Sequence, residues 1–132
     1  MNRELDNILE AICEKDGRYK RDAYEFVMEA LSFTQKKFRR PKHVTGEELL
    51  DGIKGLLLDR FGPMTLSVLK HWGIKNTEDF GNTVFNLVNN KVLSKTEEDT
   101  IENFKNGYDF KEVFGVQYQR QLAKRISKMR ST

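Results

Sequence analysis

The sequence predicts a mainly α-helical domain with one short two-stranded hairpin. Apolar residues recur at three- and four-residue spacing along most of the chain, which is the period of a helix with one buried face. Single glycines and two prolines interrupt this spacing, so the helices are short and separate. Near residues 93–104 the helical spacing gives way to two short segments around an acidic turn, and that order predicts the hairpin.

Two helices open the chain. The first is predicted at residues 2–15, where four apolar residues share one face. The second is predicted at residues 20–37, and Pro41 stops it because the residue before a proline disfavours helical angles. Tyr19 and Tyr24 lie near its start, and we expect their rings to pack while their hydroxyls remain in water.

The third helix has the clearest start signal in the chain. Thr45 is predicted to cap it, with the Glu48 side chain bonding back to the Thr45 amide in a capping box. Leucine and isoleucine residues then follow at helical spacing up to Phe61. Gly52 and Gly55 weaken this helix unless a neighbouring helix packs closely against them.

Two further helices follow the break at Gly62-Pro63. One is predicted at residues 63–72 and is closed by Gly73 in a left-handed conformation. The next is predicted at residues 77–90, with Thr77 as its cap and a buried apolar face. Its four asparagines are expected on the outside: Asn82, Asn86, Asn89 and Asn90.

The segment after this helix has two interpretations. Leu93–Thr96 and Thr100–Phe104 fit two strands joined by the acidic turn Glu97-Glu98-Asp99. The same acids fit the first turn of a helix over Glu97–Asn106. Aromatic residues at positions 108–114 are expected to close the core. From residue 117 onward, apolar spacing beneath basic residues predicts a terminal amphipathic helix.

These elements divide the chain into one helical domain at residues 1–116 and a basic amphipathic tail helix at residues 117–132. A helix, a tight exit and a hairpin follow one another in the order of the recognition helix and wing of a winged helix-turn-helix. Residues 62–112 therefore resemble the winged-helix fold.

Four longer blocks resemble the Minf family, a small bacterial domain family of unknown function. The blocks are KDGRYKRDAYEFVMEAL (Lys15–Leu31), KHVTGEELLDGI (Lys42–Ile53), FGPMTLSVLKHWGIKNTEDFGNTVFNLV (Phe61–Val88) and LSKTEED (Leu93–Asp99). The resemblance covers roughly residues 5–114 in matching order. It implies a small bacterial domain and brings no known activity, ligand or catalytic residue to this chain.

Positive charge is concentrated in two stretches that contain no acid, although the net charge is only +3. Such separation of charge suits association with a partner of opposite polarity or with another copy of the chain. The first stretch includes His43 and the second also contains Arg130. The candidate contacts to nucleic acid or another anionic partner are Lys36, Lys37, Arg39, Arg40, Lys42, Arg120, Lys124, Arg125 and Lys128.

Charge opposes nucleic-acid binding through the helix at residues 77–90. Its asparagines suit adenine, which asparagine recognises through two hydrogen bonds in the major groove. Glu78 and Asp79 open this helix, however, and the turn at residues 97–99 is acidic, so both would repel phosphates. Binding through the two basic stretches, without base readout, remains as an alternative.

The sequence favours neither a metal site nor catalysis. The acids at residues 97–102 lack the alternating spacing and glycine of a calcium loop, and His43 and His71 have no paired ligand nearby in the sequence. The chain contains no nucleophile elbow, phosphate loop or Cys–His signature. We therefore predict no enzymatic activity, no cofactor and no metal.

The chain is predicted to be cytoplasmic. Cys13 is its only cysteine, which suits a reducing compartment, and no apolar run approaches the ~20 residues that span a bilayer. The first ten residues lack the order of a signal peptide. The predicted function is a non-catalytic binding or adaptor domain with a protein partner, in an oligomeric state that the sequence does not specify. The alternative is a winged-helix-like protein associated with DNA or RNA.

Overall fold

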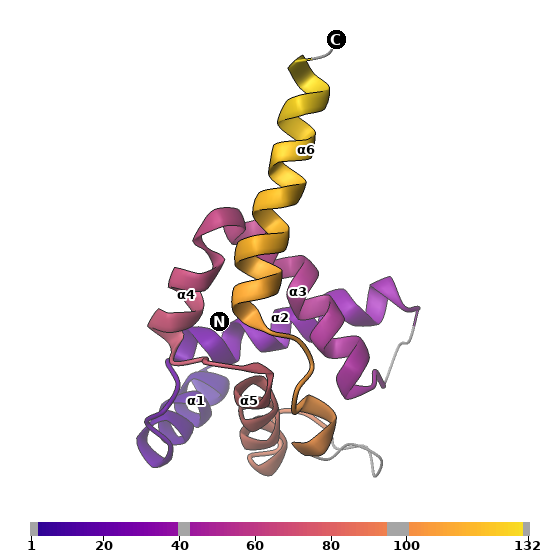
Figure 1. Cartoon of the computed structure of the whole chain (residues 1–132). Helices are drawn as coiled ribbons and strands as arrows, with labels where there is room; N and C mark the ends of the chain where they lie inside the picture. Colours follow the sequence, from indigo (N-terminus) through magenta and orange to yellow (C-terminus); the bar gives the residue numbers. More distant parts are fainter. Residues whose placement is uncertain (1–2, 40–42, 95–100, 131–132) are drawn as a thin grey trace.

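Figure 1 shows the computed structural model of the chain, in which the C-terminal helix projects from a body formed by the other elements. The structure describes residues 3–39, 43–94 and 101–130, and none of these forms a strand. The prediction of a mainly helical protein is confirmed. The elements in chain order are α1 (Arg3–Lys15), α2 (Arg21–Lys37), α3 (Gly46–Phe61), the 3₁₀ turn η1 (Gly62–Met64), α4 (Thr65–Trp72), α5 (Thr77–Asn89), the 3₁₀ turn η2 (Ile101–Phe104), the π-helix η3 (Glu112–Gln117) and α6 (Tyr118–Arg130).

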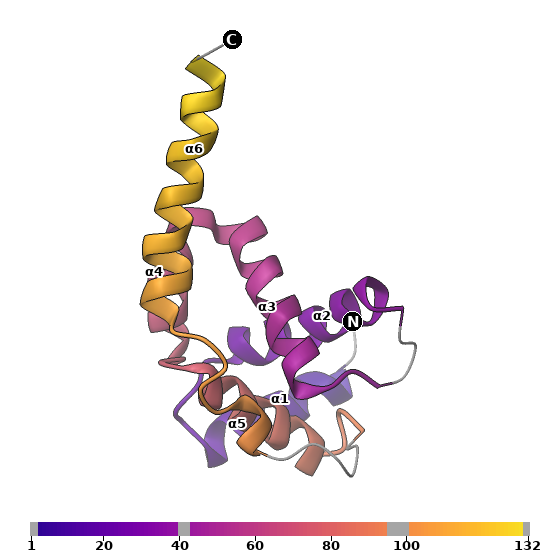
Figure 2. The ribbon, with the colours of Figure 1, turned by 45° about the vertical axis from the view of Figure 1, so that its right-hand side comes forward.

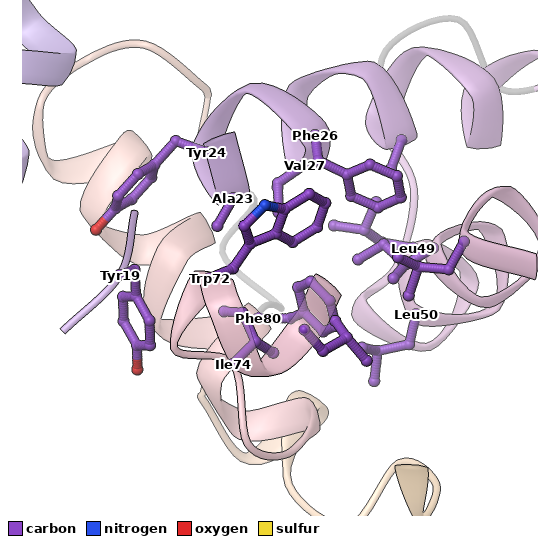
Figure 3. Close-up of a cluster of buried hydrophobic side chains, with 14 of the residues drawn as sticks. Tyr19, Ala23, Tyr24, Phe26, Val27, Leu49, Leu50, Trp72, Ile74 and Phe80 are labelled. Atoms are coloured by element: carbon purple, nitrogen blue, oxygen red, sulfur yellow. The ribbon is translucent and has the colours of Figure 1, made fainter. Parts of the chain in front are cut away.

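α2 is the central element of the body and packs against α1, α3, α4 and α5. Aromatic rings fill the space between α2 and α4, with the Phe26 and Trp72 ring centroids 5.2 Å apart. Figure 3 shows Trp72 beside Phe26 and Val27 in the middle of this core. Five residues on the inner face of α2 are completely buried: Ala23, Tyr24, Val27, Ala30 and Thr34.

α3 approaches α2 most closely at Gly52. A Cβ atom at this position would lie 1.9 Å from the Thr34 Oγ1 atom, so a larger residue requires a shift of the Thr34 side chain or of one helix. The Thr34 hydroxyl is held in place because it donates to the Ala30 carbonyl at 2.6 Å. A neighbouring helix therefore packs closely against Gly52. At Gly55 the packing is looser, because a Cβ atom there would meet only the edge of the Phe33 ring at 3.9 Å.

The helix boundaries follow local signals in most cases. Thr45 and Glu48 form the predicted capping box of α3, with bonds of 2.9 and 3.0 Å. Gly73 ends α4 with φ 83°, as predicted. The cap of α5 is different from the prediction, because Asn76 accepts the bond from the Asp79 amide. Thr77 is instead buried and donates its hydroxyl to the Phe104 carbonyl.

The predicted hairpin at Leu93–Phe104 is wrong. Ile101–Phe104 forms a single 3₁₀ turn, and its Phe104 side chain is buried against α5. Gly81 makes room for this ring, since a Cβ atom there would lie 2.7 Å from Phe104. The bond from Thr77 uses the Phe104 carbonyl, so this residue is fixed to a helix rather than to a second strand. The acidic turn at residues 97–99 lies outside the described residues.

We expect Gly52→Ala to destabilise the protein by about 1–3 kcal/mol, because the new methyl group overlaps the Thr34 hydroxyl. Alanine favours an isolated helix over glycine by about 1 kcal/mol, so the opposite sign identifies the packing effect. Gly55→Ala is the matched control in the same helix, and we expect it to be neutral or stabilising by up to about 1 kcal/mol. Chemical denaturation measures both, and equal effects would contradict the close contact at Gly52.

Candidate functional site

α6 leaves the body after its first residue. The π-helix η3 joins it to the core through Val113 and Phe114, which are buried. Tyr118 then lies against η1, where a Cβ atom on Gly62 would meet its hydroxyl oxygen at 3.1 Å. All residues from 119 to 130 are exposed, and Figures 1 and 2 show the helix pointing away from the body.

One side of α6 is apolar. Leu122, Ile126 and Met129 are 38%, 43% and 76% exposed. Their spacing of four and three residues places them on the same side of the helix. Tyr118 precedes Leu122 by four residues, so the apolar side is continuous with the part of the helix that packs on the body.

The opposite side of α6 is basic. Arg120, Lys124 and Lys128 follow one another at four-residue spacing and therefore lie in one row. Arg125 and Arg130 lie on either side of the apolar residues. Within the part of the chain that the structure describes, no carboxylate forms an ion pair with Arg120, Lys124 or Arg125.

The charges of α6 and of the rest of the chain have opposite signs. Residues 118–132 contain five basic residues and no acid. The other 117 residues contain 18 basic and 20 acidic side chains, a net charge of −2. The net charge of +3 is therefore the sum of a positively charged arm, residues 118–132, and a slightly negative remainder of the chain.

The other predicted basic stretch does not join this surface. Lys37 at the end of α2 pairs with Asp51 at 2.8 Å, and this contact lowers the pKa of Asp51. Lys36 and Arg39 line an open, shallow depression of about 520 Å³. Arg40 and Lys42 lie outside the described residues. Figures 1 and 2 place the end of α2 far from α6, so the two basic stretches are separate.

Two of the four asparagines at residues 82–90 face other parts of the body. The prediction that they lie on the outside is therefore wrong for Asn82 and Asn86. Asn82 donates to the Tyr19 hydroxyl at 2.9 Å, and Asn86 donates to the Tyr24 hydroxyl at 3.0 Å and to the Asp16 carboxylate at 2.9 Å. Asn89 and Asn90 remain exposed. The side-chain amides of Asn82 and Asn86 already bond to other parts of the body, so they are not available to form hydrogen bonds with DNA bases.

The two tyrosines of this network are buried, so the prediction that their hydroxyls remain in water is also wrong. Tyr19 donates its hydroxyl to Asp79 at 2.6 Å, and burial raises the pKa of both Tyr19 and Tyr24. Arg18 bonds to Asp16 and, together with Asn86, holds the pKa of Asp16 well below its usual range. This network joins the end of α1 to α2 and α5.

Two open clefts of about 580 and 500 Å³ lie on either side of the loop at residues 105–108. Lys105 borders both, with its Nζ atom 3.1 Å from Glu102 and 3.9 Å from Glu78. Tyr108 also borders both, and its hydroxyl donates to the Leu50 carbonyl at 2.7 Å. The side chains of Lys105 and Tyr108 are thus engaged with the protein itself.

Within residues 3–39, 43–94 and 101–130, no three histidine, cysteine or carboxylate side chains gather as ligands for a metal ion. Both histidines are exposed. In the same residues, no helix combines the length and the apolar composition that a membrane span requires. The aromatic residues near the C-terminus belong to the core, because Phe110 and Phe114 are buried with ring centroids 5.6 Å apart.

Comparison of the chain with protein-family models, with curated proteins and with solved structures gave no match. The resemblance to the Minf family therefore stays a prediction from the sequence blocks. The apolar and basic surfaces of α6 form the candidate site. The sequence predicted its basic residues and its helical spacing, but it did not indicate that the apolar side lies outside the body.

We expect Asp16→Asn to weaken the acid dependence of stability. The pKa of Asp16 is depressed in the folded protein, so its ionised form stabilises the fold above the unfolded pKa of about 3.9, and this contribution is lost as the pH falls. We expect the difference in unfolding temperature between the natural chain and the variant to become smaller as the pH is lowered from about 5 to about 2. Asp59→Asn, at an exposed position, is the control for the loss of one negative charge elsewhere on the chain.

We expect a chain that ends at Tyr118 to keep the stability of the full chain within about 0.5 kcal/mol, because all residues from 119 to 130 are exposed. Isolated helices of this length are marginal in water, so the amides of α6 beyond Leu122 should exchange rapidly in the full chain. Urea denaturation and hydrogen exchange measure the two effects. A large loss of stability would mean that α6 packs on the body.

Proposed function

We propose that this protein is a non-catalytic binding domain, an adaptor whose helical body presents α6 to a partner protein. The observation that carries the proposal is the uncovered apolar side of α6. It follows Tyr118, which packs on η1, and continues through Leu122 and Ile126, which are 38% and 43% exposed. A helix that extends its apolar side beyond its own domain offers that side to another molecule.

The energetics support this function. Complete burial of a leucine or isoleucine side chain contributes about 1.5–3 kcal/mol relative to full exposure. Leu122 and Ile126 are each about two-fifths exposed, so a partner that covers them recovers part of this amount from each. The base of the helix is already fixed by Val113 and Phe114, which reduces the entropy lost when the rest of α6 becomes ordered on binding.

The alternative function is association with DNA or RNA through the basic row of α6. Arg120 and Lys124 form no ion pairs with the described carboxylates, so they are available to phosphates. Phosphate contacts use none of the apolar side, however, and leave Leu122 and Ile126 in water. We therefore favour a protein partner over nucleic acid.

Affinity capture from the native cell distinguishes the two functions. We expect the full chain to retain protein that a chain ending at Tyr118 does not retain, and we expect nuclease treatment to leave this protein bound. Replacement of Arg120, Lys124, Arg125 and Lys128 by Gln tests the charge of α6. Replacement of four exposed lysines of the body by Gln is the matched control: Lys15, Lys20, Lys70 and Lys75.

Two results would contradict the proposal. Equal retention by the full and shortened chains would mean that α6 is not the docking element. Retention of nucleic acid alone, lost with the α6 charges and at raised salt, would support the alternative instead.

A further inference from the structure

The apolar residues of α6 form a narrow seam. Leu122, Ile126 and Met129 have the alternating four- and three-residue spacing of the core positions d, a and d in a coiled coil. Gln119, at the preceding core position, is polar. Helices that lie on a membrane surface present a broader apolar face, with large apolar residues beside the central row. The width of the seam on α6 fits one opposing helix.

Positive charge lines this seam. In the same heptad register, Arg125 and Arg130 occupy the g and e positions, which meet the flanks of the opposing helix. In a parallel pair of two α6 helices, Arg125 of one copy would face Arg130 of the other, and like charges at these positions repel. Negatively charged residues at the e and g positions of the opposing helix would instead attract Arg125 and Arg130. The flanks of α6 therefore select against a second α6 and in favour of an acidic helix.

We propose that α6 pairs, as one strand of a short two-helix coiled coil, with an amphipathic helix of a partner protein that carries leucine or isoleucine in its seam and glutamate at its flanks. This inference rests on the proposed function of α6 as a docking helix and adds the chemistry of the partner. The basic row of Arg120, Lys124 and Lys128 lies away from the seam and attracts the same acidic partner over a longer range.

The pairing is weak and reversible because it is short. The 13 residues of α6 provide about two heptads and a length of about 20 Å. A contact of this size lies below the ~1,200 Å² of stable protein complexes, which is the range of transient interactions. The fixed base at Tyr118 partly compensates by holding one end of the seam in helical form.

A designed peptide tests this chemistry. The probe is a labelled peptide of four heptads with Ile at a, Leu at d and Glu at e and g, and the control peptide has Lys at e and g. We expect the full chain to bind the Glu peptide at least about tenfold more tightly than the Lys peptide, because one tenfold change corresponds to about 1.4 kcal/mol and several charge contacts change sign. Fluorescence anisotropy measures both affinities.

Two variants separate the roles of the seam and its flanks. Leu122→Ser with Ile126→Ser should weaken binding of the Glu peptide at least about tenfold, because both side chains lose apolar burial. Arg125→Glu with Arg130→Glu should reverse the preference, so that the Lys peptide binds more tightly. All four positions are exposed, so the fold of the body should be unchanged, which the unfolding midpoint verifies.

Several results would overturn the inference. These are failure to bind the Glu peptide, binding that survives the two serine substitutions, and an α6-dependent dimer in analytical ultracentrifugation. Tighter α6-dependent binding to phosphatidylserine vesicles or to random duplex DNA at the same salt would assign the arm to a different partner. If protein retention from cells still requires α6 while the Glu peptide fails, the proposed docking function stands and only this partner chemistry is wrong.

Discussion

The contact between Gly52 and Thr34 sets the geometry on which the rest of the structure depends. Because a glycine faces a fully buried threonine, α3 lies close to the central helix α2. The far end of α3 then carries Phe61 to the Trp72 ring at 5.7 Å and places Gly62 under Tyr118. Tyr118 is the first residue of α6, and every later residue of this helix is exposed. The helix contact near the middle of α3 is therefore linked, through Phe61 and Gly62, to the point where α6 leaves the body.

α5 and α6 use their polar and apolar residues in opposite ways. α5 places Asn82 and Asn86 against buried tyrosine hydroxyls, where an unmade hydrogen bond would cost about 1–3 kcal/mol. α6 leaves about two-fifths of Leu122 and of Ile126 exposed, and this exposed area contributes nothing to the stability of the fold. The first arrangement stabilises the domain itself, whereas the second contributes only when another molecule is present. This contrast is the physical reason for assigning the partner surface to α6 rather than to the helix that resembled a recognition helix.

The parts of the structure that the sequence predicts are those that depend on neighbouring residues. The capping box at Thr45 and the left-handed Gly73 are local, as is the amphipathic spacing of α6, and all are present. The partners of Asn82 and Asn86 are 63 and 70 residues away at Tyr19 and Asp16, so no local pattern identifies them. The hairpin failed for a similar reason, since the fit of Phe104 against Gly81 brings together residues from different elements. For the candidate site, the residue spacing predicts an apolar side and a basic side of α6. It does not predict that the apolar side is exposed, because that depends on where the body ends.

Charge and apolar surface contribute to different stages of association at α6. Five basic residues on the arm and a net charge of −2 on the rest of the chain orient an approaching acidic partner toward the arm and away from the body. This attraction acts over about one Debye length, roughly 8 Å at physiological salt, and mainly raises the rate of encounter. Leu122 and Ile126 act only after contact, where their burial slows dissociation. The body satisfies its polar groups with hydrogen bonds of its own, whereas α6 carries both the positive charge and the apolar side chains that attract a partner. Folding and partner recognition therefore depend on different residues.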